Sequence, residues 1–156
     1  KAKLHIMKPE AKIDVNGVKF TGTKCNHYDP AIGFRISADG VEVGYTSDSA
    51  YYKGMEKYYD GCKLLIINTV IPKGQIAKRA GYMSVDGIIS LLNAMKQKPQ
   101  LVILTHFSFW LMRSNLWKQE KIIQDATKVK TIHAEDFMAI DTKTLAVTKY
   151  RGPGKV

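Results

Sequence analysis

The stretch Leu101-Val102-Ile103-Leu104-Thr105-His106-Phe107-Ser108 places a histidine directly after a continuous run of apolar residues. An uninterrupted apolar run of this length predicts a buried strand, and Leu64–Asn68 has the same character. A strand fixes the backbone, and the loop that follows it exposes the side chain. We therefore predict two buried strands, with His106 presented at the end of the second.

The chain before these strands has the pattern of a strand-rich region. Asn16-Gly17 and Asp39-Gly40 are tight-turn signals of the kind that join antiparallel strands. They predict strands at Val18–Lys24, at residues 33–37 and at Val41–Tyr45. Residues 49–59 are expected to form a short aromatic-rich helix that ends at Asp60-Gly61.

The chain after residue 68 alternates helix and strand. A basic loop at 72–81 leads to Ser84, a helix cap followed by apolar residues at helical spacing. A second helix is expected at about 114–127, then a strand at 130–134, a hairpin of 137–140 with 145–149, and a frayed tail at 151–156. This order predicts an α+β fold of one domain, residues 1–156, with a mixed β-sheet and helices on one face.

Charge and composition narrow the class of protein. The formal net charge is +10, from 24 Lys and Arg against 14 Asp and Glu. Such a surplus favours polyanionic partners, nucleic acid first, but the cations are dispersed, so a solvated surface is an equal alternative. The apolar runs are too short to span a bilayer, and the N-terminus does not read as a signal peptide. Cys25 and Cys62 lack metal-site spacing, which favours two reduced thiols in a cytoplasmic protein.

Three polar residues follow predicted strands and are candidate metal ligands. His27, Asp48 and His106 each lie at or just beyond a strand end. Imidazole nitrogen and carboxylate oxygen suit zinc and similar divalent ions, and a carboxylate can bridge two of them. Taken singly, a residue of this kind is more often structural, so the case depends on their combination.

The combination resembles the metallo-β-lactamase superfamily. Residues 26–36, Asn-His-Tyr-Asp-Pro-Ala-Ile-Gly-Phe-Arg-Ile, are similar to the segment in which a ligand histidine precedes a Gly-aromatic strand. Residues 44–49, Gly-Tyr-Thr-Ser-Asp-Ser, resemble the next motif, and residues 101–108 resemble the last ligand motif. Residues 61–68 and 134–138 are similar to the buried strand between them and to the closing motif, with Phe137 in place of the usual Gly. The resemblance runs from Val18 to Ile140 and is closest to the ribonuclease Z-like branch.

The resemblance implies a metal-dependent hydrolase. Its site would hold two divalent metal ions, zinc or else manganese, whose bound hydroxide attacks a phosphodiester, such as RNA, or another ester. His27 and His106 would be terminal ligands, and Asp48 would be the bridging ligand and a catalytic residue. Two metals about 3.5–4 Å apart activate water and hold the attacking and leaving oxygens.

One departure from the family concerns the missing ligands. The His-x-His-x-Asp-His signature is absent, because the four histidines are scattered at His5, His27, His106 and His133. That signature belongs to the N-terminal half of the fold. The resemblance therefore implies that this chain is the C-terminal half of an αββα sandwich. We expect its missing N-terminal half, or a homo-oligomer, to complete it.

A second departure is Tyr82, within Gly81-Tyr82-Met83-Ser84, where relatives often have Gly-His. Tyr82 is a candidate catalytic proton donor, although a phenol is a weaker acid than an imidazolium and is poorly matched to this task near neutral pH. The replacement puts RNA cleavage in particular in question. Metal binding does not depend on it.

Two non-enzymatic functions remain open: a nucleic-acid-binding module and a partner-docking module built on the half-fold. Lys73, Lys78 and Arg79 form a modest basic loop suited either to phosphate or to solvent. His133 is interpreted as a packed or surface residue. The aromatic residues after His106 are interpreted as core and loop packing, with a base-stacking platform as the alternative; they are Phe107, Phe109, Trp110 and Trp117.

Overall fold

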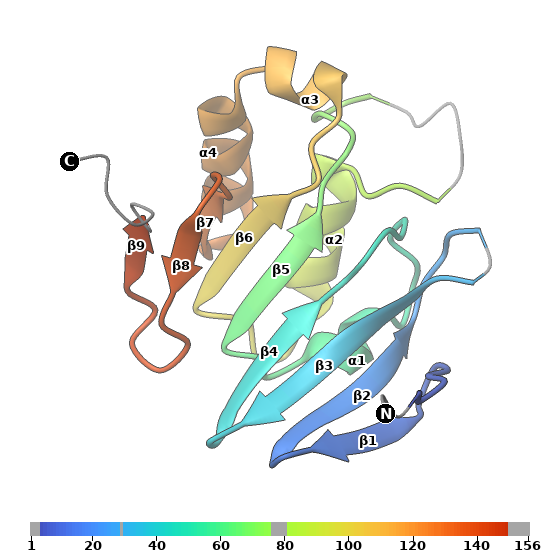
Figure 1. The fold of residues 1–156 in the computed structure, drawn as a ribbon. Helices are drawn as coiled ribbons and strands as arrows, with labels where there is room; N and C mark the ends of the chain where they lie inside the picture. Colours follow the sequence, from blue (N-terminus) through green and yellow to red (C-terminus); the bar gives the residue numbers. More distant parts are fainter. Residues whose placement is uncertain (1–3, 29, 76–80, 150–156) are drawn as a thin grey trace.

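The computed structural model describes residues 4–28, 30–75 and 81–149, and its main feature is a seven-stranded mixed sheet in the order β1 to β7 (Figure 1). Strands β1 to β4 pair antiparallel, and the pairs from β4 to β7 are parallel. The strands are β1 (Lys12–Val15), β2 (Val18–Lys24), β3 (Ile32–Ala38), β4 (Val41–Tyr45), β5 (Leu64–Asn68), β6 (Leu101–Thr105) and β7 (Lys130–His133). The predicted mixed sheet is confirmed.

Helices cover one face of this sheet (Figure 1). The longest are α2 (Val85–Ala94) and α4 (Leu116–Thr127), with a single turn, α1 (Glu56–Tyr59), over the earlier strands. Alternate residues of β5 and β6, among them Leu65 and Leu104, pack beneath them in the main core. Ser84 caps α2 as predicted, because its hydroxyl accepts a hydrogen bond from the Gly87 amide.

The opposite face is apolar and only partly covered. A separate hairpin, β8 (Met138–Ile140) with β9 (Val147–Lys149), belongs to a small cluster around Leu64, Leu101 and Ile103. Further along the sheet the apolar side chains are half-buried. The strand registers align them on this one face, which we call the open apolar face; it consists of Ile13, Phe20, Phe34, Ile36 and Val43.

Tyr59 explains two of the glycines in the sheet. It is fully buried, and its hydroxyl lies 2.6 Å from the Thr23 hydroxyl and donates to the Tyr45 carbonyl at 3.3 Å. A Cβ added at Gly33 or Gly44 would approach Tyr59 to 2.7 Å. The chain therefore folds closely around Tyr59 where β3 begins and β4 ends, next to the loops that carry His27 and Asp48.

The predicted helix at residues 49–59 is largely wrong, because helix begins only at Glu56. Ser49 and Ala50 are instead bound to the loop after β2: the Ser49 hydroxyl accepts from the Asn26 amide, and the Ala50 amide donates to the Asn26 carbonyl. These tertiary hydrogen bonds hold residues 49–50 outside any helix.

The helix expected at about 114–127 is confirmed as α4 (Leu116–Thr127). The region after His106 differs from its prediction only in an extra short helix, α3 (Phe109–Arg113), before it. The predicted strand at 130–134 and the terminal hairpin are confirmed within one to two residues. The predicted tail at 151–156, together with Lys78 and Arg79 of the basic loop, lies outside the described residues.

Candidate metal centre

Three neighbouring parallel strands end at the same edge of the sheet and bring polar side chains together there. Asp48 follows β4, Asn68 ends β5 and His106 follows β6. The registers place Tyr45 beside Ile66 and Asn68 beside Thr105, so the strand ends are level. The carboxyl ends of parallel strands are the usual position for ligand-binding groups in such sheets.

Asp48 lies between the other two side chains. His106 Nε2 is 3.4 Å from Asp48 Oδ1, and the same oxygen accepts a 2.8 Å hydrogen bond from Asn68 Nδ2. The His106 side chain is 55% exposed and that of Asp48 27% exposed, so both can be reached by an ion from solution. The structure thus brings together two of the three predicted ligands, Asp48 and His106.

Two of the non-glycine residues with left-handed backbone lie at the same strand ends. His106 has a φ of +56°, and Ser47, just before Asp48, has a φ of +53°. Residues other than glycine rarely adopt this left-handed conformation, which costs about 1–3 kcal/mol and is concentrated at functional sites. The surrounding hydrogen bonds hold both strand ends in this geometry, including the Thr69 amide to the Thr105 carbonyl at 2.7 Å.

His27 lies on the loop between β2 and β3, which the Asn26 hydrogen bonds attach to residues 49–50. Its Nδ1 is 2.8 Å from the Gly81 carbonyl oxygen. A carbonyl can only accept, so Nδ1 is the donor in this contact and Nε2 is the ring nitrogen left to face a metal. A Cβ at Gly81 would lie 2.8 Å from this Nδ1, so the contact depends on glycine.

Tyr82 is a direct neighbour of His27. The two rings meet edge to face with centroids 5.1 Å apart, and the Tyr28 ring also meets His27 edge to face, with centroids 5.3 Å apart. The predicted proton donor therefore lies beside a predicted metal ligand. Among the described residues, the side chains that pair or hydrogen-bond with Asp48 are those of His106 and Asn68, not those of His27 or Tyr82.

The imidazole nitrogens of His27 and His106 and the Asp48 carboxylate are ligand types that bind divalent ions, but their arrangement is that of a partial site. Among residues 4–28, 30–75 and 81–149, no group of three or more His, Cys, Asp or Glu side chains is placed to hold a metal ion. Asp48 and His106 come together, and His27 is held by Gly81 on the adjoining loop. Asn68, only 5% exposed, leaves its buried Oδ1 without a hydrogen-bond partner among the described residues, so one acceptor beside Asp48 is unsatisfied.

Asn68 and Gly81 were not predicted as site residues. Asn68 is a polar residue at the end of a buried apolar strand, as His106 is just after the next one. This position at a strand end is the feature of the sequence that could have identified it. Its role depends on the parallel register of β5 with its neighbours, which the sequence pattern does not specify. Gly81 shows its role only through the distance of its carbonyl from His27.

The cysteines do not act as ligands in this arrangement. Both are free, as predicted, and burial raises the pKa of each thiol to about 11. For Cys25, which donates to the Thr46 carbonyl, the negative charge of Asp48 contributes further to the increase in pKa. A thiolate is therefore scarce near neutral pH, and nitrogen and oxygen donors remain for a metal.

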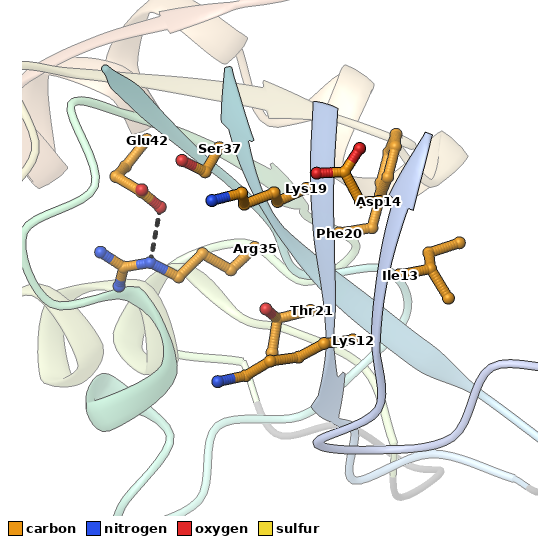
Figure 2. Close-up of a pocket in the computed structure, with 9 residues that line it drawn as sticks. All are labelled: Lys12, Ile13, Asp14, Lys19, Phe20, Thr21, Arg35, Ser37 and Glu42. Atoms are coloured by element: carbon orange, nitrogen blue, oxygen red, sulfur yellow. Dashed lines mark hydrogen bonds and ion pairs between the residues drawn. The ribbon is translucent and has the colours of Figure 1, made fainter. Parts of the chain in front are cut away.

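A pocket of about 590 Å³ lies elsewhere, over β1 to β4 (Figure 2). Most of the residues that line it are polar or charged, and Arg35 within it pairs with Glu42 at 2.8 Å and donates to the carbonyls of Tyr58 and Asp60. None of the predicted site residues is among the nine that line it. The strand ends that carry Asp48 and His106 are therefore separate from this pocket.

Comparisons with known proteins identify the family and the fold. The chain is 33% identical over 118 residues to an uncharacterized protein of Methanocaldococcus jannaschii, covering 75% of this chain and 42% of that protein. The metallo-beta-lactamase fold protein YhfI from Bacillus subtilis is similar in structure, with a TM-score of 0.71, 21% identity, and coverage of 83% of this chain and 52% of that one.

Two further solved structures are similar at lower scores. The short form of human tRNase Z has a TM-score of 0.57 and 22% identity, covering 83% of this chain and 45% of that one. Zn(2+)-bound PqqB from Methylobacterium extorquens has a TM-score of 0.58 and 14% identity, covering 83% and 49%. This chain spans about half the length of each of these proteins.

The described helices include none with the length and apolar composition of a membrane span. A family model described as a beta-lactamase superfamily domain matches residues 1–107, more than half of the sequence. The fold, the order of the strand-end residues and this match agree, and the chain belongs to the beta-lactamase superfamily.

Proposed function

We propose that this chain is the C-terminal half of a metal-dependent hydrolase that acts on a phosphodiester, in the manner of the ribonuclease Z-like branch. The observation that carries the proposal is the contact of His106 Nε2 with Asp48 Oδ1 at the ends of adjacent parallel strands. The proton on His27 Nδ1 supports it, because ligating histidines commonly donate their other ring nitrogen to a carbonyl. The net charge of +10 favours a polyanionic substrate.

The roles follow from the donor atoms. His27 and His106 would be terminal ligands and Asp48 the bridging one, and the bound ions, zinc in our proposal, would supply an activated water molecule and stabilise charge on the phosphate. Asn68 orients the Asp48 carboxylate through its 2.8 Å hydrogen bond. The remaining ligands would come from the preceding half of the fold.

The open apolar face supports this division of the fold. Half of a sandwich leaves one sheet face uncovered, and Phe20, Phe34 and Ile36 occupy such a face here. Relatives roughly twice the length of this chain have room for a second sheet. We propose that this second sheet, or a second copy of the chain, covers the open apolar face. The two free cysteines fit a reducing compartment such as the cytoplasm.

The proposed function is tested with the complete gene product and a chromogenic diester, bis-p-nitrophenyl phosphate. We expect hydrolysis that is lost on chelation and restored by zinc or manganese. The combined replacement His27→Ala, Asp48→Ala, His106→Ala should abolish both turnover and bound metal. His5→Ala is the control, because His5 is an exposed residue away from the strand ends. Stoichiometric metal retained by the triple variant would rule out these ligands.

The role of Tyr82 has its own test. If the phenol donates a proton to the leaving group, Tyr82→Phe should lower kcat by about 100-fold and change KM little. The loss should shrink with a diester whose leaving group is a stable anion, because such a group needs no proton. Tyr28→Phe, which alters the other ring beside His27, is the matched control. Equal losses for both leaving groups would show that Tyr82 only supports the position of His27.

A further inference from the structure

Three of the four aromatic residues after His106 are exposed, so the interpretation of these three as core packing is wrong. Phe109 is 59% exposed, Trp110 69% and Trp117 70%, whereas Phe107 is half-buried as expected. Isolated exposed apolar residues are common, but a cluster of large ones marks an interaction surface. We call the group on α3 the aromatic platform; it consists of Phe109, Trp110, Met112 and Arg113.

The fold holds the aromatic platform in place from below. The Ser108 hydroxyl donates to the Val70 carbonyl and accepts from the Leu111 amide, which fixes the start of α3 on the loop after β5. Leu111 is fully buried in the main core. With its inner side anchored there, the short helix presents its other large side chains to solvent.

The charges around the aromatic platform select the chemistry of its partner. The Arg113 guanidinium lies over the Phe109 ring, 5.0 Å from its centroid, and Trp110 meets Phe109 edge to face at 6.1 Å. Residues 105–118 contain Arg113 and Lys118 and no acidic residue. Flat rings paired with local cations, on a chain of net charge +10, match the stacked bases and phosphates of a single nucleic-acid strand.

The position of the aromatic platform connects it to the strand-end site. α3 begins three residues after His106 and lies above the ends of β5 and β6 (Figure 1). A strand whose bases stack on α3 therefore passes the edge of the sheet where Asp48 and His106 meet.

We propose that the aromatic platform binds single-stranded nucleic acid, with bases stacked on Trp110 and Phe109 and a phosphate at Arg113. This proposal names a substrate class for the site where Asp48 and His106 meet. It rests on the proposed function only for the hydrolysis of the bound strand, not for its binding. Binding to the aromatic platform needs no metal. It can therefore be tested apart from hydrolysis.

The test uses tryptophan fluorescence, because Trp110 and Trp117 are the only two tryptophans in the sequence. Trp117→Phe leaves Trp110 as the sole reporter, and Trp110→Phe leaves Trp117. Titration of the purified chain with a twelve-residue oligouridylate in EDTA should quench Trp110. Trp110→Ala should raise Kd about 10-fold or more, measured with labelled RNA, while Trp110→Phe keeps most of the affinity. Arg113→Gln should reduce the slope of log Kd against log salt concentration by about 1, as expected for the loss of one phosphate contact.

Controls separate stacking from general charge attraction. Phe137→Ala removes an exposed aromatic residue outside the platform, and Lys57→Gln removes an exposed charge on α1. Both should bind RNA like the parent chain, and circular dichroism should show that every variant is folded. RNA binding that Trp110→Ala leaves unchanged would overturn the proposal. So would quenching of Trp110 by lipid vesicles or by a second copy of the chain in place of RNA. RNA binding by the aromatic platform without any diester hydrolysis would instead refute the proposed function and support the binding role of the platform.

Discussion

Ile36→Lys is expected to convert the purified 156-residue chain from a self-associated form to a monomer, raising its dissociation constant by about 30-fold or more. Ile36 lies near the middle of the open apolar face, paired with Phe20 on β2 and Val43 on β4. An uncovered apolar surface of this kind associates with another copy when its natural cover is absent. A lysine at its centre would have to bury an unpaired charge, which strongly disfavours association.

The neighbouring residue supplies the control, because successive side chains of a strand point to opposite faces. Ser37 lies next to Ile36 on β3 and faces the polar pocket with Arg35 and Glu42 (Figure 2). Ser37→Lys adds the same charge to the same strand and should leave the association unchanged. Sedimentation velocity over a concentration series measures both. A parent chain that stays monomeric at high concentration, or equal effects of the two substitutions, would contradict a docking role for the open apolar face.

The features that the sequence predicted well are those set by local pattern. The continuous apolar runs at β5 and β6 are buried strands, and Asp39-Gly40 does join β3 to β4, since their registers pair Ala38 with Val41. Ser84 caps its helix as its hydroxyl and position predicted. Such features depend on residues close in the chain, and physical periodicity is enough to recognise them.

The features that failed or were missed depend on contacts between distant segments. The helix expected from residue 49 is shortened because Ser49 and Ala50 bind Asn26, more than twenty residues earlier. Asn68 became a site residue only when the parallel register placed its amide on Asp48. The aromatic residues of α3 look like core by composition. Their exposure follows from the anchoring of Leu111, which the sequence alone does not distinguish from its neighbours.

Asp48→Asn is expected to lower the zinc affinity of the chain by about 100-fold or more, because it removes the negative charge on which the proposed bridging role depends. The substitution is nearly isosteric. The amide keeps an oxygen that can still accept the hydrogen bond from Asn68, so packing and the strand ends should be preserved. A large loss of affinity with unchanged thermal unfolding of the metal-free chain would therefore report the charge and not a disturbed fold.

Competition with a zinc-binding indicator measures this affinity, and a distant carboxylate provides the comparison. Asp125 on α4 is exposed and pairs with Lys121 one turn away, so Asp125→Asn removes the same charge without touching the strand ends. Its zinc affinity should match that of the parent chain, since exposed charges far from a site are screened by solvent and salt. His106→Ala should weaken zinc binding as well, because its Nε2 lies beside the same carboxylate oxygen. If Asp48→Asn and Asp125→Asn bind zinc alike, the ion is held elsewhere, and the contact between Asp48 and His106 serves only to join the ends of β4 and β6.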